Sequence, residues 1–128
     1  MSMEEKRRAN GSIIWRHYKN ERKIIHREDG PARLWYYSNG NFKQRQWFIR
    51  GKLHREDGPA LINQDKNGEI YHQRYYINGK LHREDGPAVL SKDKKGEYYL
   101  RGKRSTKREW AEHLFYKDFE STMSSDDE

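Results

Sequence analysis

Apolar and polar residues alternate along this chain in short stretches that end at glycine-containing turns. Ala32 and Leu34 stand two positions apart, and so do Trp47 and Ile49. Equivalent pairs recur as Ala60 and Ile62, Tyr75 and Ile77, Ala88 and Leu90, and Tyr98 and Leu100. Side chains two positions apart on a β-strand point to the same face of the sheet. The pattern predicts an all-β protein of short strands that each bury one face.

The alternation belongs to a repeat of 28 residues. The heptapeptide His-Arg-Glu-Asp-Gly-Pro-Ala occurs three times without change, at residues 26–32, 54–60 and 82–88. A glycine follows each motif histidine after fourteen residues, and two copies have another glycine eleven residues later (Gly40, Gly68 and Gly96; Gly51 and Gly79). Asparagine precedes Gly40 and Gly68, and Asn-Gly favours a type I′ turn. Each unit is therefore predicted to contain two antiparallel strands and two tight turns, within an elongated meander sheet.

The heptapeptide has the composition of a segment that ends one strand and begins the next. Asp-Gly favours a turn, glycine adopts backbone angles forbidden to other residues, and proline removes a donor where strand pairing ends. We expect arginine and acidic side chains of adjacent units to form a charged ladder along one edge. A segment repeated in every unit usually encodes the unit itself. A structural role is thus predicted for His26, Arg27, Asp29, Gly30, Pro31, His54, Arg55, Asp57, Gly58, Pro59, His82, Arg83, Asp85, Gly86 and Pro87.

Histidine, arginine and carboxylates are also the residue types of catalytic and metal sites. A metal site needs several ligands converging on one point, whereas three translated copies offer three separate and incomplete sets. We therefore predict no metal, no cofactor and no catalytic residue, and a hydrolase using His-Arg-Glu-Asp is the weakest functional hypothesis. The chain also lacks a phosphate-binding glycine loop, a Gly-x-Ser-x-Gly elbow and a His-Glu-x-x-His pair.

The two ends of the chain depart from the repeat, as terminal units of repeat arrays generally do. Residues 1–9 are predicted to be a flexible N-terminus and residues 10–104 the β-hairpin repeat domain. Thr106 and Glu109 have capping-box spacing, which predicts a C-terminal capping helix over residues 105–120. Its apolar side would consist of Trp110, Leu114, Phe115 and Phe119. Residues 121–128 are predicted to be a disordered acidic tail.

Composition narrows the class of protein. Only 32% of the 128 residues are hydrophobic and 37% are charged, but the chain has nine Tyr, four Trp and four Phe. Such rings bury a large area per side chain, so they can stabilise a thin sheet. The sequence has no cysteine, no apolar run of membrane-spanning length and no signal-peptide pattern. We expect an intracellular, cytoplasmic protein without a transmembrane segment.

Net charge and aromatic residues suggest two kinds of partner. The net charge is +7, and the last eleven residues hold five acidic and no basic side chains, so the first 117 residues carry +12. The leading hypothesis is a protein-interaction or assembly module, because aromatic residues are common interface anchors. Its candidate binding face is Trp35, Tyr37, Phe48, Tyr76 and Tyr99. The alternative is binding of nucleic acid or an anionic surface, since Arg45–Arg50 mixes cations with aromatic rings. Peripheral membrane contact is a weaker expectation.

The stretch Gly-Lys-Leu-His-Arg-Glu-Asp-Gly-Pro-Ala, with a downstream Asn-Gly and an aromatic pair before the next Gly-Lys, resembles MORN-like hairpin repeats. It is most similar to the His-Arg-x-Asp-Gly-Pro-Ala variety found in proteins of large DNA viruses and phages. The resemblance covers about residues 10–104. It implies stacked β-hairpins with roles in scaffolding and protein contact, sometimes lipid contact, and no catalytic residues. It also suggests a viral protein, located in the host cytoplasm or the virion.

Overall fold

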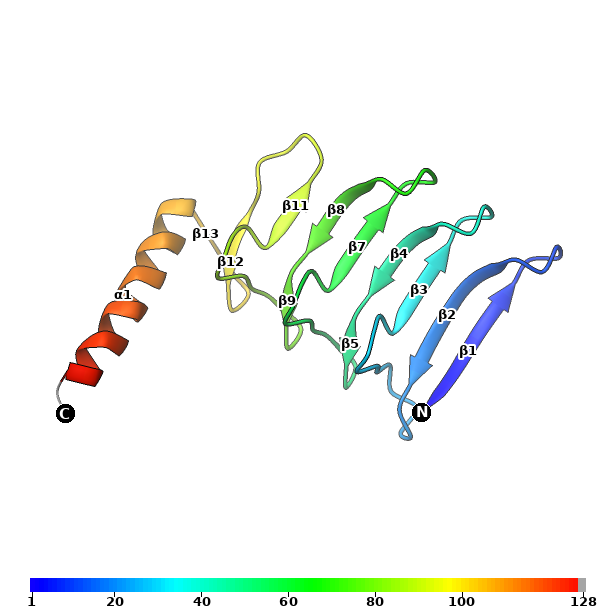
Figure 1. Cartoon of the computed structure of the whole chain (residues 1–128), viewed down its shortest axis with the longest axis horizontal. Helices are drawn as coiled ribbons and strands as arrows, with labels where there is room; N and C mark the ends of the chain where they lie inside the picture. Colours follow the sequence, from blue (N-terminus) through cyan, green and yellow to red (C-terminus); the bar gives the residue numbers. More distant parts are fainter. Residues whose placement is uncertain (127–128) are drawn as a thin grey trace.

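A computed structural model describes the backbone of residues 1–126 and the side chains of residues 1–116. Over that range the chain forms a seven-stranded antiparallel meander sheet with three short hairpins and one C-terminal helix (Figure 1). The sheet strands follow chain order as β1 (Ser2–Arg7), β2 (Ile13–Lys19), β3 (Arg33–Tyr36), β4 (Phe42–Gln46), β7 (Leu61–Gln64), β8 (Ile70–Arg74) and β11 (Val89–Ser91). The predicted all-β repeat fold with a C-terminal helix is confirmed.

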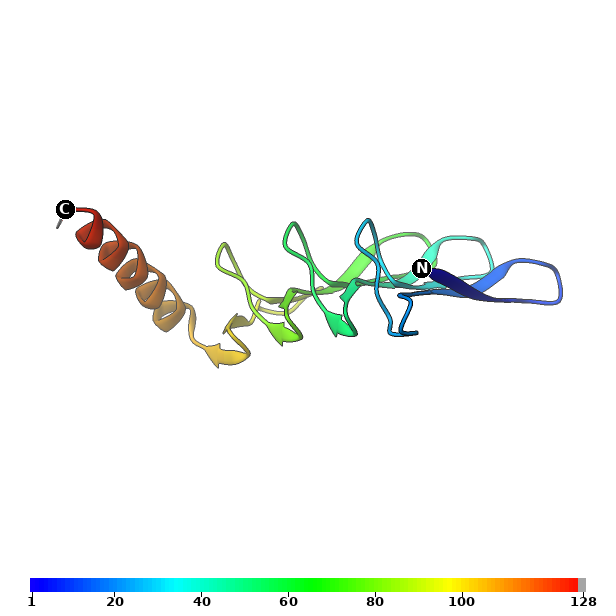
Figure 2. The ribbon, with the colours of Figure 1, turned by 90° about the horizontal axis from the view of Figure 1, so that it is seen from below.

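The short hairpins continue the second strand of each unit. They pair β5 (Phe48–Ile49) with β6 (Lys52–Leu53), β9 (Tyr76–Ile77) with β10 (Lys80–Leu81), and β12 (Tyr98–Leu100) with β13 (Lys103–Ser105). A single residue, Trp47 or Tyr75, separates the long strand from the hairpin strand. Figure 2 shows the short hairpins on one side of the sheet and the heptapeptide loops standing on the other.

The turns differ from the prediction at Asn39-Gly40 and Asn67-Gly68. At Gly40 only the glycine has a positive φ, of 91°, and its N–H donates to the Tyr37 carbonyl oxygen at 3.0 Å. This is a type I turn followed by a glycine bulge, and a register shift lies next to it in the β3–β4 ladder. The predicted type I′ turns are wrong here. Type I′ angles occur instead in the short hairpins, where Arg50 and Gly51 have φ of 51° and 80°.

The buried residues of this thin sheet are few. Among the described side chains the buried hydrophobic ones are Ala32, Leu34, Ala60, Ile62, Ala88 and Val89. Leu34 and Ile62 flank Arg45 in one cross-strand row, which continues through Gln73 to Leu90. Leu90 therefore lies on the expected face, but it is only half-buried. Val89 is buried instead because it pairs with β8 on one side and with Glu97 on the other.

The motif histidine ties the segment directly before it, which for His54 and His82 is a short hairpin, to the turn of the next short hairpin. His54 Nδ1 accepts a hydrogen bond from the Asn78 N–H at 2.9 Å. The same bond joins His26 to Arg50 at 2.8 Å and His82 to Arg101 at 2.9 Å. Each donor residue has a positive φ, an arrangement costly for a non-glycine residue. The histidine thus stabilises the strained first position of a type I′ turn.

The motif arginine is clamped in place by three contacts. The Arg55 guanidinium lies 4.0 Å from the Trp47 ring centroid, and its Nε and Nη1 donate to Asp57 and to the Pro59 carbonyl at 3.0 and 3.1 Å. Tyr18 and Tyr75 take the place of Trp47 beneath the arginines of the other two motifs, also at 4.0 Å. The arginine–aspartate bonds lie within one motif, so the predicted ladder between units is wrong.

The motif glycine and alanine are required for space. Gly30, Gly58 and Gly86 do not have positive φ, contrary to the prediction. A Cβ on Gly58 would lie 2.8 Å from Arg55 Cζ, so a side chain here would displace the guanidinium. Ala60 is fully buried between strands; its N–H donates to the Arg74 carbonyl and its carbonyl accepts from the Trp47 N–H. The small alanine side chain leaves room for these strands to approach closely.

Both chain ends differ from the sequence-based boundaries. Residues 2–7 are not a flexible segment but strand β1, which pairs with β2 along its whole length. The helix α1 (Lys107–Asp126) extends past residue 120 into the predicted tail, and residues 127–128 lie outside the described range. No helix within residues 1–126 combines the length and hydrophobicity that crossing a bilayer requires.

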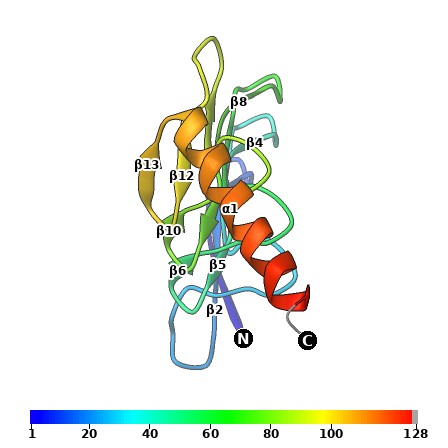
Figure 3. The ribbon, with the colours of Figure 1, turned by 90° about the vertical axis from the view of Figure 1, so that its left-hand side faces the viewer.

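The helix caps the array only through its first turns. Glu109 N–H donates to Thr106 Oγ1 at 3.1 Å, which confirms the capping box. Trp110 packs on Tyr98 with ring centroids 4.9 Å apart, and its indole donates to the Arg83 carbonyl at 2.7 Å. Toward its C-terminal end the helix runs away from the sheet (Figures 1 and 3). Phe115 is 65% exposed, so its predicted packing is wrong, and the Phe119 side chain lies outside the described residues.

Gly58→Ala should lower the free energy of unfolding by about 1–2 kcal/mol, because the displaced Arg55 loses its bonds to Asp57 and Pro59. Urea unfolding of the single and double variants measures this. The Arg55→Ala/Gly58→Ala double variant should be no less stable than Arg55→Ala alone. An equal cost in both backgrounds would show that the glycine is not there to accommodate the arginine.

Candidate binding surface

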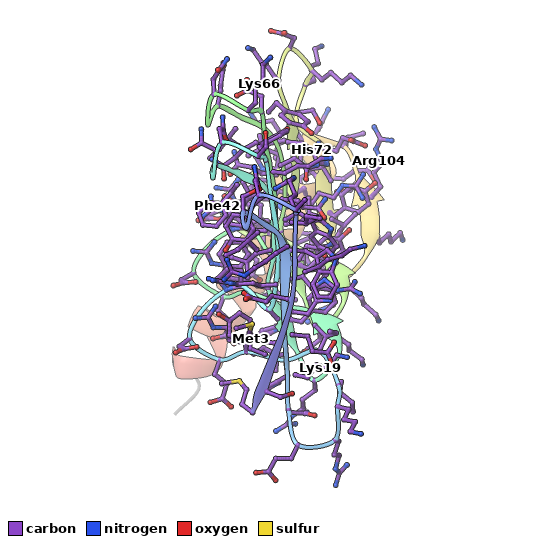
Figure 4. The ribbon with its side chains drawn as sticks, turned by 90° about the vertical axis from the view of Figure 1, so that its right-hand side faces the viewer. Met3, Lys19, Phe42, Lys66, His72 and Arg104 are labelled. Atoms are coloured by element: carbon purple, nitrogen blue, oxygen red, sulfur yellow. The ribbon has the colours of Figure 1, made fainter. Side chains whose placement is uncertain are left out.

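The sheet has two faces of different character. We call the side that carries Leu34, Ile62 and the heptapeptide loops the motif face, and the opposite side the aromatic face. Arg45 and Phe42 belong to the motif face, where the Arg45 guanidinium lies 4.8 Å from the Phe42 ring. Figure 4, viewed along the array, shows Phe42 and Arg104 on opposite sides of the thin sheet. Each side chain of a strand thus lies either on the motif face or on the aromatic face.

The aromatic face gathers the five predicted binding residues. The Arg33 guanidinium lies 5.7 Å from the Trp35 ring and 5.6 Å from the Phe48 ring, which places both rings on its side of the sheet. The carbonyl groups of Phe48, Tyr76 and Tyr99 each accept the N–H of a motif arginine, so the three residues occupy equivalent positions. Tyr37 lies near Lys43, with the ammonium 5.9 Å from its ring. All five side chains are half-buried.

Other residues of this face were not singled out from the sequence. Trp15 stacks on His17 with ring centroids 4.2 Å apart, and His17 meets Trp35 edge-on at 5.2 Å. A shallow hollow of about 270 Å³ is lined by Trp35, Lys43, Gln44, Asn63 and Tyr71. Trp15 and His17 are two positions apart, as are Arg33 and Trp35. This spacing could have shown from the sequence that the two members of each pair share a face. It could not have shown that both pairs lie on the same face, because that depends on the register between the strands.

Three buried polar atoms that lack a hydrogen-bond partner in the described part of the chain lie in one cross-strand row of the aromatic face. His17, Arg33 and Gln46 are consecutive cross-strand neighbours. Within the described residues His17 Nε2, Arg33 Nε and Gln46 Oε1 are each buried without a hydrogen-bond partner. Leaving such groups unpaired costs free energy. The row therefore does not contribute the greatest possible stability to the fold. Such departures are typical of functional surfaces.

Two histidines of this face have lowered pKa values. Burial lowers the pKa of His17, and the charges of Arg33 and Lys19 lower it further. Burial and Arg74 lower the pKa of His72. His72 Nε2 accepts a hydrogen bond from Arg74 Nε at 2.9 Å, and its Nδ1 lies 2.6 Å from Ser91 Oγ. Since Arg74 can only donate, His72 is held in its neutral form with the proton on Nδ1.

The motif carboxylates lie on the opposite face from the aromatic binding residues, whereas basic side chains occur on both faces. The motif carboxylates Asp29, Asp57 and Asp85 project from the motif loops with 78%, 88% and 85% of the side chain exposed. The aromatic face instead carries cations on its cross-strand rows: Lys6, Arg33, Lys43 and Arg74. The Glu and Asp of each repeat therefore do not neutralise the basic residues near the aromatic rings.

The motif histidines do not form a common site. Each binds a different turn through Nδ1, and its Nε2 lies 3.6–3.9 Å from the glutamate of the same motif. Over the part of the chain with described side chains, no three His, Asp or Glu residues are grouped as a metal site would require. The arrangement offers repeated surfaces for binding.

Comparison of the chain with protein-family models, with curated proteins and with solved structures finds no match.

The stability of the fold should fall as the pH drops below about 6.5, the usual pKa of histidine. His17 and His72 have folded-state pKa values below that of the unfolded chain, so the unfolded chain binds more protons in this range. Urea unfolding at several pH values measures the effect. A His17→Gln/His72→Gln variant should lose less stability over the same range. An equal loss in the variant would assign the pH dependence to other groups.

Proposed function

We propose that this chain is a non-enzymatic interaction module whose aromatic face binds an acidic region of a partner protein, in a scaffolding or assembly role. The observation that carries the proposal is the position of the motif carboxylates, which lie on the opposite face from the aromatic rings and the cations beside them. On the face away from the motif carboxylates, aromatic rings lie beside basic side chains. The rings are those of Trp35, Phe48 and Tyr76, and the basic side chains are Arg33, Lys43 and Arg74. Aromatic rings and arginine are the residue types that most often anchor protein interfaces.

The repeat architecture supports an extended binding surface. Equivalent positions such as Phe48, Tyr76 and Tyr99 recur from unit to unit along the sheet. Repeat arrays use such series of equivalent positions to bind long partners. The resemblance to MORN-like repeats agrees with a scaffolding role, and viral origin remains an expectation from that resemblance.

Two adjacent residues allow a matched test of which face binds. Tyr71 lines the hollow of the aromatic face, whereas Ile70 pairs with Gln64, whose amide oxygen accepts from Arg45 on the motif face. The two side chains are 43% and 42% exposed. A photo-crosslinking phenylalanine analogue at position 71 should capture a protein segment rich in Asp and Glu in the native cell. The same analogue at position 70 should not.

Charge reversal supplies the control for that capture. Lys43→Glu should abolish the crosslink from position 71, whereas Lys66→Glu, in the turn between β7 and β8, should leave it intact. Equal capture from positions 70 and 71, or capture unaffected by Lys43→Glu, would contradict the proposal. The crosslinked peptide is identified by mass spectrometry.

A second candidate, single-stranded nucleic acid, is favoured by the cations beside the aromatic rings. Bases can stack on exposed rings while Arg and Lys contact phosphates. If this mode operates, the affinity for a fluorescent oligothymidine should fall steeply between about 50 and 200 mM salt. Lys43→Ala should reduce the slope of log affinity against log salt by about one. Affinity that does not depend on salt would rule out this mode.

A further inference from the structure

The three motif loops project from the motif face side by side, in a row along the array (Figure 2). We name them loops 27–31, 55–59 and 83–87. The same arginine contacts hold each loop: a stacked ring, an aspartate and the carbonyl of the motif proline. The gaps between the loops are therefore preformed and nearly identical.

Two clefts lie between successive loops. The first, of about 800 Å³, has Trp47 and Ile49 as its apolar floor and loops 27–31 and 55–59 as its walls. The second, of about 670 Å³, has Tyr75 and Ile77 as its floor and loops 55–59 and 83–87 as its walls. Trp47 and Tyr75, like Ile49 and Ile77, are 28 residues apart, so the clefts are two copies of one site.

Each cleft is acidic, although the protein as a whole is basic. The lining of either cleft includes four carboxylates and two arginines, a net charge of −2 with histidine neutral. Both motif arginines already donate to an aspartate and to a carbonyl group of their own loop. Glu28 and Glu56 extend into solvent with 84% and 83% of the side chain exposed. The clefts are thus complementary to cations with an apolar stem, such as Lys or Arg side chains.

The distance between the clefts selects the conformation of the ligand. Successive units are displaced by two strands, or about 9.6 Å at the usual spacing. A polyproline II helix advances about 9.3 Å in each turn of three residues. In a β-strand, residues on the same side recur at multiples of about 6.8 Å. Only the polyproline II spacing places one side chain over each cleft.

We propose that the clefts bind an extended polyproline II segment of a partner protein that carries Lys or Arg at every third residue. The segment runs along the array across the tops of the loops. Its cationic side chains enter successive clefts, with their stems on Trp47 or Tyr75 and their charges near the loop carboxylates. This site lies on the face opposite to that of the proposed function, so the module joins a basic and an acidic partner.

The test uses two fluorescent peptides of identical composition. One contains four Lys-Pro-Pro repeats, and the other has its lysines in adjacent pairs. Fluorescence anisotropy should show that the periodic peptide binds about tenfold more tightly, because two side chains enter two clefts at once. Glu56→Lys alters the loop shared by both clefts and should weaken binding about tenfold. Equal binding of the two peptides would overturn the proposal.

Glu112→Lys on α1 is the matched control, since it makes the same charge change at an exposed helix position. It should leave binding within about twofold of the unaltered protein. If both variants weaken binding equally, the attraction is general and the cleft site is refuted. Crosslinking from position 71 should be unaffected by Glu56→Lys, and peptide binding should be unaffected by Lys43→Glu. The two proposals can therefore fail independently.

Discussion

A sheet of one layer has no second layer to bury its apolar residues, and every other feature of this protein follows from that constraint. Only six described hydrophobic side chains are buried, and half of them are alanines. Stability must come from contacts between neighbouring units. The heptapeptide supplies them, because its histidine secures the turn of the next short hairpin and its arginine covers an aromatic ring of the preceding unit. The unit is repeated because one copy cannot be stable alone.

The contacts of the motif arginine also make the two faces of the sheet different. Because the motif arginine must reach the ring beneath it, all three motif loops stand on one side of the sheet and carry their carboxylates with them. The other side keeps its half-buried rings and the cations beside them. A structural requirement of the repeat thus puts acidic clefts on one face and the aromatic rings with their neighbouring cations on the other. Scaffolding by two partners is the use that we propose for these two surfaces.

Sequence reasoning found the architecture because the repeat is long and unchanged. It placed the strands of the repeat, the faces of Leu34 and Ile62 and the Thr106 cap of the helix correctly. It assigned the wrong turn types, because Asn-Gly occurs both in type I′ turns and in type I turns with a glycine bulge, and local sequence does not separate them. It missed strand β1, since Ser2–Arg7 is charged and becomes ordered only by pairing with β2. The contacts of Arg55 with Trp47 and Gly58 depend on loop geometry, which alternation does not encode.

Amide hydrogen exchange tests most directly the claim that the motif histidine couples one short hairpin to the next. The Asn78 N–H should exchange slowly in the native protein, since it donates to His54 Nδ1 at 2.9 Å. In a His54→Ala variant, exchange at Asn78 and in the β9–β10 hairpin should become faster, while β1–β2 stays protected. Unchanged protection at Asn78 would contradict the account, because the histidine would then have no part in linking the units.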